Sequence, residues 1–312
     1  MKKPSEDFLV VTVLVITYNS SKYILETLNS IKAQSYPYLS VVISDDGSKD
    51  KTVLKCEKWI KENRDRFVDA SIVKSDVNTG ISANINRGQK ACKTKWVKGI
   101  AGDDLLLPNC IQDNVDYVLD NPETVYLFSR IHFFGKSSNL LENVKSNYNY
   151  RLFSLSAPQQ YERIVFHHDS IPAATAFYNL GKLIELDIKC DERIPFVDDT
   201  PKYLNVLKRG FPLKFFDKET VDYRVHNESI SSSSIPSVNF YTSLRLFYYY
   251  YLRDEYIKKY GLDWTIQNDV VSQKQIYENY LRYRNHLFGK IYSYIEVIKS
   301  KIFNFKRFTK LS

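Results

Sequence analysis

Short apolar runs alternate with segments of helical spacing along the first hundred residues. The clearest runs are rich in Val, Ile and Leu and lie at 8–16, 39–43 and 96–100, with a less apolar one inside 69–80. Segments of helical spacing follow the runs at 8–16, 39–43 and 69–80. The first of these segments places Ile24, Leu28 and Ile31 on one face. Strands and helices that alternate in this way build a sheet with crossover helices. We therefore predict an α/β fold whose mostly parallel central sheet is flanked by helices.

Polar turns follow three of the predicted strands, with the sequences "TYNS", "SDDGS" and "AGDD". The carboxyl ends of parallel strands meet at one edge of a sheet, and ligands bind at that edge. The last turn contains two neighbouring carboxylates, Asp103 and Asp104, which repel each other unless a cation or a donor network lies beside them. The turns therefore predict a ligand site at this edge.

The composition limits the class of protein. The chain has 312 residues, 44% of them hydrophobic, so it can bury the core of one large domain or of a domain with an appendage. Its four cysteines are scattered without C-x-x-C spacing, which favours reduced thiols in the cytoplasm. The apolar run at 8–16 is far shorter than the roughly 20 residues that span a bilayer. The net charge of +8 predicts an anionic partner.

A serine-rich stretch at 229–237 separates two parts of the chain that differ in amino-acid composition. Before it, further strands are predicted within 124–135, 173–180 and 211–226. Beyond it, Tyr, Phe, Lys and Arg recur at helical spacing. The sequence therefore predicts an α/β domain over 1–230 and a C-terminal helical region over 231–312.

Six segments between Val10 and Ser231 together resemble the family 2 glycosyltransferases. In chain order they are "VITYNS", "SDDGSKDKT", "NTGISANINRG", "AGDD", "DERIPFVDDTPKYLNVLKRG" and "YRVHNESIS". One such motif is weak support, whereas six in the family's order are specific. The resemblance implies the nucleotide-diphosphate-sugar-binding fold called GT-A, with a C-terminal helical extension, and an enzyme that transfers a sugar from a nucleotide sugar.

The resemblance also implies which residues bind the nucleotide sugar. A carboxylate suits the uracil N3–H, which donates a hydrogen bond. By resemblance this carboxylate is Asp46, with the Tyr18 ring against the base. The full predicted set is Thr17, Tyr18, Asn19, Asp45, Asp46, Asn78, Gly80, Asn84, Arg87, Asp103 and Arg224.

A divalent cation, Mn²⁺ or Mg²⁺, is implied at the fourth motif. Such cations prefer carboxylate oxygens and stabilise the charge that develops on a leaving diphosphate. Asp103 is the first predicted ligand, and Asp104 lies beside it. His226 is predicted to add a nitrogen ligand or to contact the diphosphate. One departure from the family pattern is Ala101, where many relatives carry an aspartate.

A second departure concerns the third motif, where Ile85 replaces the family's arginine, so that Arg87 or Lys90 would supply the positive charge. The fifth motif carries the acidic pair Asp198 and Asp199. By resemblance Asp199 is the general base, which removes the proton from an acceptor hydroxyl that attacks the sugar directly. That route inverts the anomeric centre.

Each acidic motif also has a purely structural reading. Asp, Gly and Ser form ordinary turns and helix caps, so 45–48 could be only a turn. The pair at 103–104 could cap a helix that begins near Pro108, and the pair at 198–199 could cap the helix after it. Capping and catalysis are compatible at the second pair.

The last residues carry an apolar stripe at helical spacing, flanked by lysines. The stripe consists of Ile291, Ile295, Ile298, Ile302 and Phe305. A basic amphipathic helix of this kind predicts binding to the surface of an anionic membrane, and packing on protein or on a second subunit is the alternative. Many bacterial members of the family act on lipid-diphosphate-linked sugars at the inner leaflet. The resemblance therefore implies an enzyme in the cytoplasm, peripheral on the bacterial inner membrane, with a lipid-linked saccharide as acceptor, and a homodimer stays open.

Three classes of function compete at this level. The leading one is a UDP-sugar-dependent, metal-dependent inverting transferase for bacterial surface polysaccharide such as O-antigen or capsule. A transferase that uses a dTDP-sugar such as dTDP-rhamnose, or a module that binds nucleotide sugar or membrane without catalysis, is the alternative. Nucleic-acid binding is not expected, because much of the excess positive charge lies in the tail and the chain has no recognised nucleic-acid motif.

Overall fold

The computed structural model describes residues 8–135, 148–167, 169–194, 196–225, 243 and 246–260. The chain divides into two units, 1–232 and 233–312. The described part of the second unit contains a π-helical turn, η4 (Tyr248–Leu252), and the helix α10 (Arg253–Tyr260). No helix in the described residues is long and apolar enough to cross a bilayer.

The first unit is built on one eight-stranded sheet with the strand order β3-β2-β1-β4-β7-β6-β8-β5. Its first half follows the alternating pattern of the sequence. The elements are β1 (Val11–Thr17), α1 (Ile24–Lys32), β2 (Leu39–Asp45), α2 (Thr52–Asn63), the 3₁₀ turn η1 (Arg64–Arg66), β3 (Asp69–Lys74), α3 (Ile81–Ala91) and β4 (Trp96–Ala101). These four strands pair in parallel.

The second half of the sheet is mixed. Its strands are β5 (Leu105–Leu106), β6 (Tyr126–Gly135), β7 (Phe177–Asn179) and β8 (Lys214–Val225), and its helices are α4 (Cys110–Asp120), α6 (Ala157–His167), α7 (Leu180–Glu185) and α8 (Thr200–Lys208). Two 3₁₀ turns, η2 (Tyr150–Ser154) and η3 (Ala173–Thr175), complete it. β6 and β8 are parallel, whereas β7 and β5 run antiparallel to their neighbours. The predicted α/β fold with a mostly parallel sheet is therefore confirmed.

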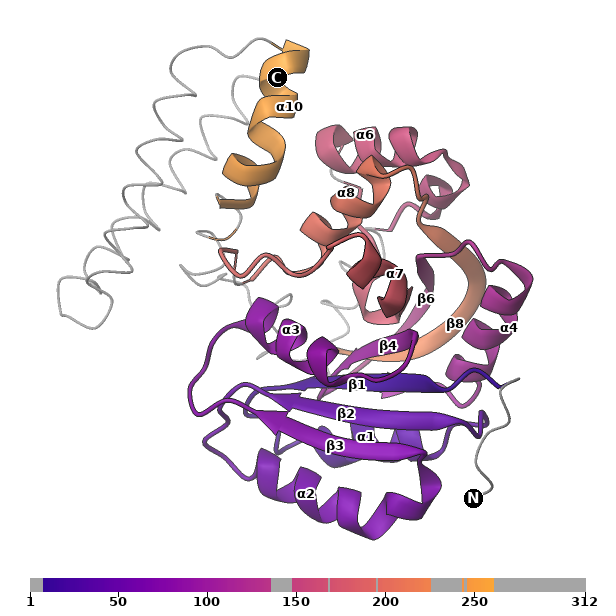
Figure 1. Cartoon of the computed structure of the whole chain (residues 1–312), viewed down its shortest axis with the longest axis vertical. Helices are drawn as coiled ribbons and strands as arrows, with labels where there is room; N and C mark the ends of the chain where they lie inside the picture. The colour runs from indigo at the N-terminus through magenta and orange to yellow at the C-terminus, as the bar shows by residue number, and fades with distance from the viewer. Residues whose placement is uncertain are drawn as a thin grey trace, which may run out of the picture. The chain divides into compact units, whose positions relative to one another are not determined.

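Helices cover both faces of the parallel half, as Figure 1 shows for α2 and α3 on opposite sides of β1 to β3. The alternation of side chains along a strand explains the arrangement. Val11, Val13 and Val15 of β1 lie in one hydrophobic cluster with apolar residues of α1 and α2. On the other face, the Ser44 hydroxyl of β2 donates a 2.9 Å hydrogen bond to the backbone carbonyl of Asn84 in α3. Amphipathic helices therefore hold the sheet from both sides.

Two sequence-based readings differ from the structure. The predicted strand within 173–180 is shorter, because η3 precedes β7 and α7 begins at Leu180. The capping alternative for 103–104 is wrong, since α4 begins at Cys110 and Asn109 is its N-cap residue. Asp103 and Asp104 instead occupy the loop between β4 and β5.

Candidate active site

The register of the parallel strands brings the three polar turns to one edge of the sheet. Thr17 at the end of β1 pairs with Asp45 at the end of β2, and Ile16 pairs with Ala101 at the end of β4. The turns that follow these residues therefore begin at one level. This confirms that the polar turns share the edge at which ligands of such sheets bind.

Asp45 links the first two turns by accepting hydrogen bonds from both of them. Its side chain is buried, and it accepts hydrogen bonds from the Thr17 hydroxyl at 2.9 Å and from the Ser48 backbone N–H at 2.9 Å. The Asn19 backbone N–H donates to the Ser48 hydroxyl at 2.8 Å, and the Asn19 side-chain oxygen accepts from the Lys49 backbone N–H at 2.9 Å. Tyr18 is 47% exposed between them. The two turns are thus one cross-linked unit that presents the Tyr18 side chain.

Asp46 joins this unit to the loop before α3. Its carboxylate is buried and accepts from the Thr79 backbone N–H at 3.0 Å, the Gly80 backbone N–H at 2.8 Å and the Arg87 guanidinium at 3.0 Å. Gly80 has φ +92°, a value that L residues rarely adopt, and Asn78 accepts from the Gly80 backbone N–H at 3.0 Å. Protein donors therefore already bind the Asp46 carboxylate. A hydrogen bond to a nucleobase stays a prediction for this residue.

Helix α3 supplies two more of the predicted residues, Asn84 and Arg87. The Asn84 side-chain amide is buried, donates to the Thr17 carbonyl at 3.2 Å and accepts from the Ser44 hydroxyl at 2.6 Å. Arg87 also donates to the Asn84 side-chain oxygen at 3.2 Å. Asn84 and Arg87 therefore tie helix α3 to the first two turns, and Arg87 forms an ion pair with Asp46. That Arg87 or Lys90 supplies the charge of the family's arginine stays a prediction.

The loop with Asp103 and Asp104 is packed closely on the first turn. A Cβ added to Gly102 would lie 2.9 Å from the Thr17 Cγ2 atom, so only glycine allows this approach. Asp103 is half-buried, whereas Asp104 is buried. Burial, followed by the negative charge of Asp103, raises the pKa of Asp104 to about 8. A cation beside the pair would oppose both effects.

Arg224 lies against this carboxylate loop. Its backbone N–H donates to the Asp104 carboxylate at 2.8 Å, and its Nε donates to the Asp103 carbonyl at 2.7 Å. The guanidinium pairs with Glu26 at 2.7 Å and lies between the rings of Tyr23 and Phe134, 4.4 and 4.5 Å from their centroids. These contacts assign Arg224 to holding the loop in place. Contact with a nucleotide sugar, the role expected from the sequence, stays a prediction.

His226, the predicted nitrogen ligand, lies outside the described residues. Within the described residues, no group of three or more His, Cys, Asp or Glu side chains is placed to hold a metal ion. Of the three predicted metal ligands, the described residues include the two carboxylates of Asp103 and Asp104. This set fits a hard cation that takes one or two protein carboxylates and completes its shell with phosphate and water.

The acidic pair of the fifth motif lies at the start of α8. Asp199 is the N-cap residue, and its Oδ1 atom accepts from the Thr200 backbone N–H at 2.6 Å and from the Thr200 hydroxyl at 3.1 Å. The capping reading is therefore confirmed. Among the described residues these bonds go to Oδ1, so Oδ2 is the oxygen that remains for a proton. Catalysis by Asp199 stays a prediction.

Helix α3 also fastens the segment that leads to this pair. The Ser82 hydroxyl donates to the Ile194 carbonyl at 2.9 Å. The Asn86 side chain donates to the Cys190 carbonyl and accepts from the Cys190 backbone N–H, both at 3.0 Å. One helix thus connects the Asp46 loop with the approach to Asp198 and Asp199. The sequence reading missed Ser82 and Asn86, although both lie inside the third motif.

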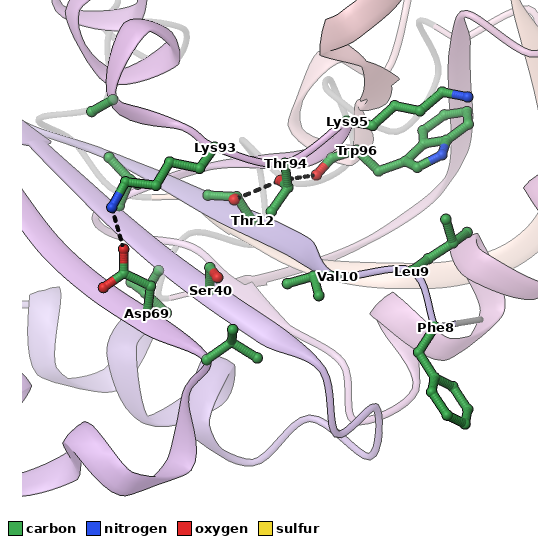
Figure 2. A pocket seen from close by; sticks show the side chains of 14 residues that line it. Phe8, Leu9, Val10, Thr12, Ser40, Asp69, Lys93, Thr94, Lys95 and Trp96 are labelled. Carbon is green, nitrogen blue, oxygen red and sulfur yellow. Dashed lines mark hydrogen bonds and ion pairs between the residues drawn. The ribbon is translucent and has the colours of Figure 1, made fainter. Parts of the chain in front are cut away.

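A pocket of about 380 Å³ lies at the opposite edge of the sheet, where β1, β2 and β4 begin (Figure 2). Phe8, Thr12 and Trp96 help to line it, and Lys93 on its wall pairs with Asp69 at 3.0 Å. None of the predicted site residues lines this pocket. It is therefore separate from the candidate active site.

The Asp46 anchor generates a prediction about stability. The substitution Asp46→Asn removes the charge that pairs with Arg87 and places an amide N–H₂ among donors. We expect a loss of about 1–3 kcal/mol in the free energy of unfolding, measured by urea denaturation. Asp113→Asn is the matched control, because it pairs with the exposed Lys218 and its loss of stability should be clearly smaller. Equal losses in the two variants would contradict the anchoring role.

The family model of glycosyl transferase family 2 matches residues 12–176. An uncharacterised glycosyltransferase of Methanocaldococcus jannaschii is 22% identical over 238 residues, which are 75% of this chain and 77% of that protein. The chondroitin synthase of Escherichia coli is 26% identical over 223 residues. That match covers 71% of this chain and only 30% of the synthase.

Solved structures share the fold at low sequence identity. Residues 1–349 of Staphylococcus aureus TarS, in complex with UDP-GlcNAc, match with a TM-score of 0.60 and 22% identity over 84% of this chain and 70% of that one. The mannosyltransferase PcManGT of Pyrobaculum calidifontis, in complex with GDP-Man and Mn²⁺, matches with a TM-score of 0.57 and 19% identity over 81% and 68%. Because the family model covers more than half of its length, this chain belongs to glycosyltransferase family 2.

Proposed function

We propose that this glycosyltransferase moves a hexose or N-acetylhexosamine from a UDP-sugar to a hydroxyl of a lipid-diphosphate-linked sugar, with inversion at the anomeric carbon. The biological product would be a bacterial surface polysaccharide such as O-antigen or capsule. The observation that carries the proposal is the shared edge of the sheet, where a carboxylate loop lies beside two cross-linked polar turns. The complex of TarS with UDP-GlcNAc supports a uridine nucleotide.

The chain's own residues suggest how the donor would be held. Tyr18 is exposed between the first two turns and offers its ring to a base. Asp103 would hold a divalent cation, which stabilises the negative charge on the leaving diphosphate. Arg224 donates a hydrogen bond to the Asp103 carbonyl and pairs with Glu26, and these contacts hold the loop of Asp103 in place. The Mn²⁺ in the PcManGT complex supports this choice of cation class.

Asp199 is proposed as the general base. Its Oδ1 atom is engaged at the cap of α8, which fixes the orientation of the carboxylate. Oδ2 would accept the proton of the acceptor hydroxyl as that oxygen attacks the sugar carbon. One base suffices for direct displacement, since no covalent intermediate has to be resolved.

The nucleotide site can be tested by calorimetric titration of UDP in the presence of Mn²⁺, Mg²⁺ or EDTA. We expect binding that depends on the cation. Asp103→Ala should weaken it by about tenfold or more, since a charge-assisted contact contributes about 1.5–3 kcal/mol. Asp65→Ala, an exposed aspartate in η1, is the control and should leave the affinity unchanged.

Other outcomes of this titration revise the proposal in defined ways. Binding of dTDP or GDP in place of UDP would change the donor and leave the site intact. Unchanged UDP affinity in Asp103→Ala would place the cation elsewhere. Nucleotide binding without turnover under any cation would favour the non-catalytic module, for which Ala101 is the motivating residue.

The base can be tested by Asp199→Asn, which keeps an oxygen to cap α8 and removes the proton acceptor. Transfer should fall by about 10²–10⁴-fold, the usual contribution of a positioned base. The measurement is UDP release from UDP-sugars with lipid-linked saccharides as acceptors. UDP affinity should stay at the wild-type value, and so should the activity of the control Asp120→Asn at the exposed end of α4. Near-normal transfer by Asp199→Asn would remove this residue from its role.

Association with the cytoplasmic face of the inner membrane is part of the proposal and rests on the sequence of the tail. The stripe from Ile291 to Phe305 and its lysines lie outside the described residues. Each lysine near an anionic bilayer contributes up to about 1 kcal/mol. The lipid-linked acceptor would be met at that surface.

Deletion of residues 289–312 should release the protein from vesicles that contain phosphatidylglycerol, as measured by flotation. Binding of the full chain should weaken with added salt and be absent from neutral vesicles. Sedimentation velocity of both forms provides the comparison. If the deletion leaves flotation unchanged but converts a dimer to a monomer, the tail packs on a second subunit instead.

A further inference from the structure

Lys98 is a fully buried lysine in strand β4. This strand leads directly into the carboxylate loop, residues 102–104, which carries Asp103 and Asp104. Lysines are almost never fully buried unless they are paired, because an unpaired ammonium loses its hydration. The ammonium of Lys98 therefore needs partners inside the protein.

Backbone carbonyls bind the Lys98 ammonium. It donates to the carbonyls of Gly99 and Ala174 at 2.7 Å each, and it reaches the Ala176 carbonyl at 3.5 Å. Burial lowers the pKa of Lys98 to about 8, so at neutral pH most of it is an ammonium with three N–H donors. Ala174 belongs to the turn η3 and Ala176 follows it, so the ammonium fastens η3 to β4.

The turn η3 runs along β4 toward the carboxylate loop. β7 pairs antiparallel with β4, and Lys98 is opposite Phe177. The Gly99 backbone N–H donates to the Ala176 carbonyl at 3.3 Å, which extends this pairing by one residue toward the end of β4. Lys98 therefore holds η3 at the strand that forms the first end of the loop.

Hydrogen bonds continue from η3 to the other end of the carboxylate loop. The Thr175 hydroxyl accepts from the backbone N–H of Ser129 in β6 at 3.1 Å. The hydroxyls of Ser129 and Thr220 are hydrogen-bonded at 2.6 Å, and the Thr220 carbonyl in β8 accepts from the Leu107 backbone N–H at 2.9 Å. The chain of contacts that begins in β4, before the loop, thus ends at Leu107, after it.

The loop depends on this chain of contacts because its two ends belong to strands that do not pair. In the sheet order, β7, β6 and β8 lie between β4 and β5. The polar side chains that connect them, those of Lys98, Ser129, Thr175 and Thr220, are each 0% exposed. A buried polar group that loses its partner is costly, so a fully bonded chain resists rearrangement of the strands.

We propose that Lys98 is a positioning residue for the transfer reaction, whose ammonium, through η3, Ser129 and Thr220, holds the two ends of the carboxylate loop in place. The inference rests on the proposed role of Asp103 in binding a cation. Lys98 acts through the loop and not on the substrate. A role in packing alone would lower the stability of the protein and leave the loop and its ligand affinity unchanged.

The first test is hydrogen–deuterium exchange of the free, full-length protein, which needs no ligand. Lys98→Met keeps the length of the side chain and removes the ammonium. Peptides that cover 99–107 should exchange about tenfold faster than in wild type, because a local opening then breaks fewer hydrogen bonds. Gln160→Met is the matched control, since Gln160 is equally buried and its amide binds the backbone of Leu155 and Leu213.

The control should leave the exchange of 99–107 at the wild-type rate. Unchanged exchange of these peptides in Lys98→Met would overturn the proposal. An equal increase in Lys98→Met and Gln160→Met would overturn it as well, because a general loss of stability then explains both variants.

The second test is calorimetric titration of UDP with Mn²⁺ into the same folded variants. Lys98→Met should weaken UDP binding by about 2- to 30-fold, the range for coupling carried through packed networks, whereas Gln160→Met should bind as wild type does. Equal affinities of Lys98→Met and wild type would overturn the proposal. If wild type itself binds no UDP, the proposed function fails, and the exchange measurement still decides whether Lys98 holds the loop.

A second variant keeps both tests decisive if Lys98→Met does not fold. Thr220→Val removes the hydroxyl that binds Ser129 and leaves the backbone bond to Leu107 intact. Exchange of 99–107 and UDP affinity should change in the same direction as in Lys98→Met but by a smaller factor, since a bond between neutral groups is weaker than one from an ammonium. Wild-type values of both in Thr220→Val would overturn the proposal.

Discussion

The parallel pairing of β1 with both β2 and β4 is the constraint on which the candidate site depends. It sets Thr17 level with Asp45 and Ile16 level with Ala101, so three turns from distant parts of the sequence start at one edge. A shift of one residue would turn each strand's side chains to the opposite face. The buried odd-numbered valines of β1 therefore fix the site as firmly as they fix the core.

Some polar residues at this edge hold its turns together, and others are placed where they could bind a ligand. Asp45, Asp46 and Asn84 are buried and accept hydrogen bonds from protein donors. Buried polar groups of this kind are costly unless they are fully satisfied, so the network resists rearrangement. Tyr18 and Asp103 are more exposed and remain suited to a ligand. The site is thus a stiff frame that presents a few groups at its surface.

Helix α3 and strand β8 extend this frame to the rest of the domain. α3 binds the turn after β2 through Arg87 and the approach to α8 through Asn86. β8 contributes Arg224, whose guanidinium lies between two aromatic rings and pairs with Glu26 of α1. The edge with the polar turns, the carboxylate loop and the segment that leads to the acidic pair are therefore held by direct hydrogen bonds to neighbouring elements.

The sequence by itself determined the α/β class, the positions of β1, α2 and β2, and the meeting of the polar turns, because periodicity and turn composition are local properties. It also indicated the family, since the motifs occur in a fixed order. Only the tertiary structure decided that Asp46 anchors the loop before α3 and that the Arg224 side chain donates a hydrogen bond to the Asp103 carbonyl. These facts depend on contacts between residues about 30 to 120 positions apart, such as Asp46 with Gly80 and Asp104 with Arg224. No local pattern encodes which donor reaches which carboxylate.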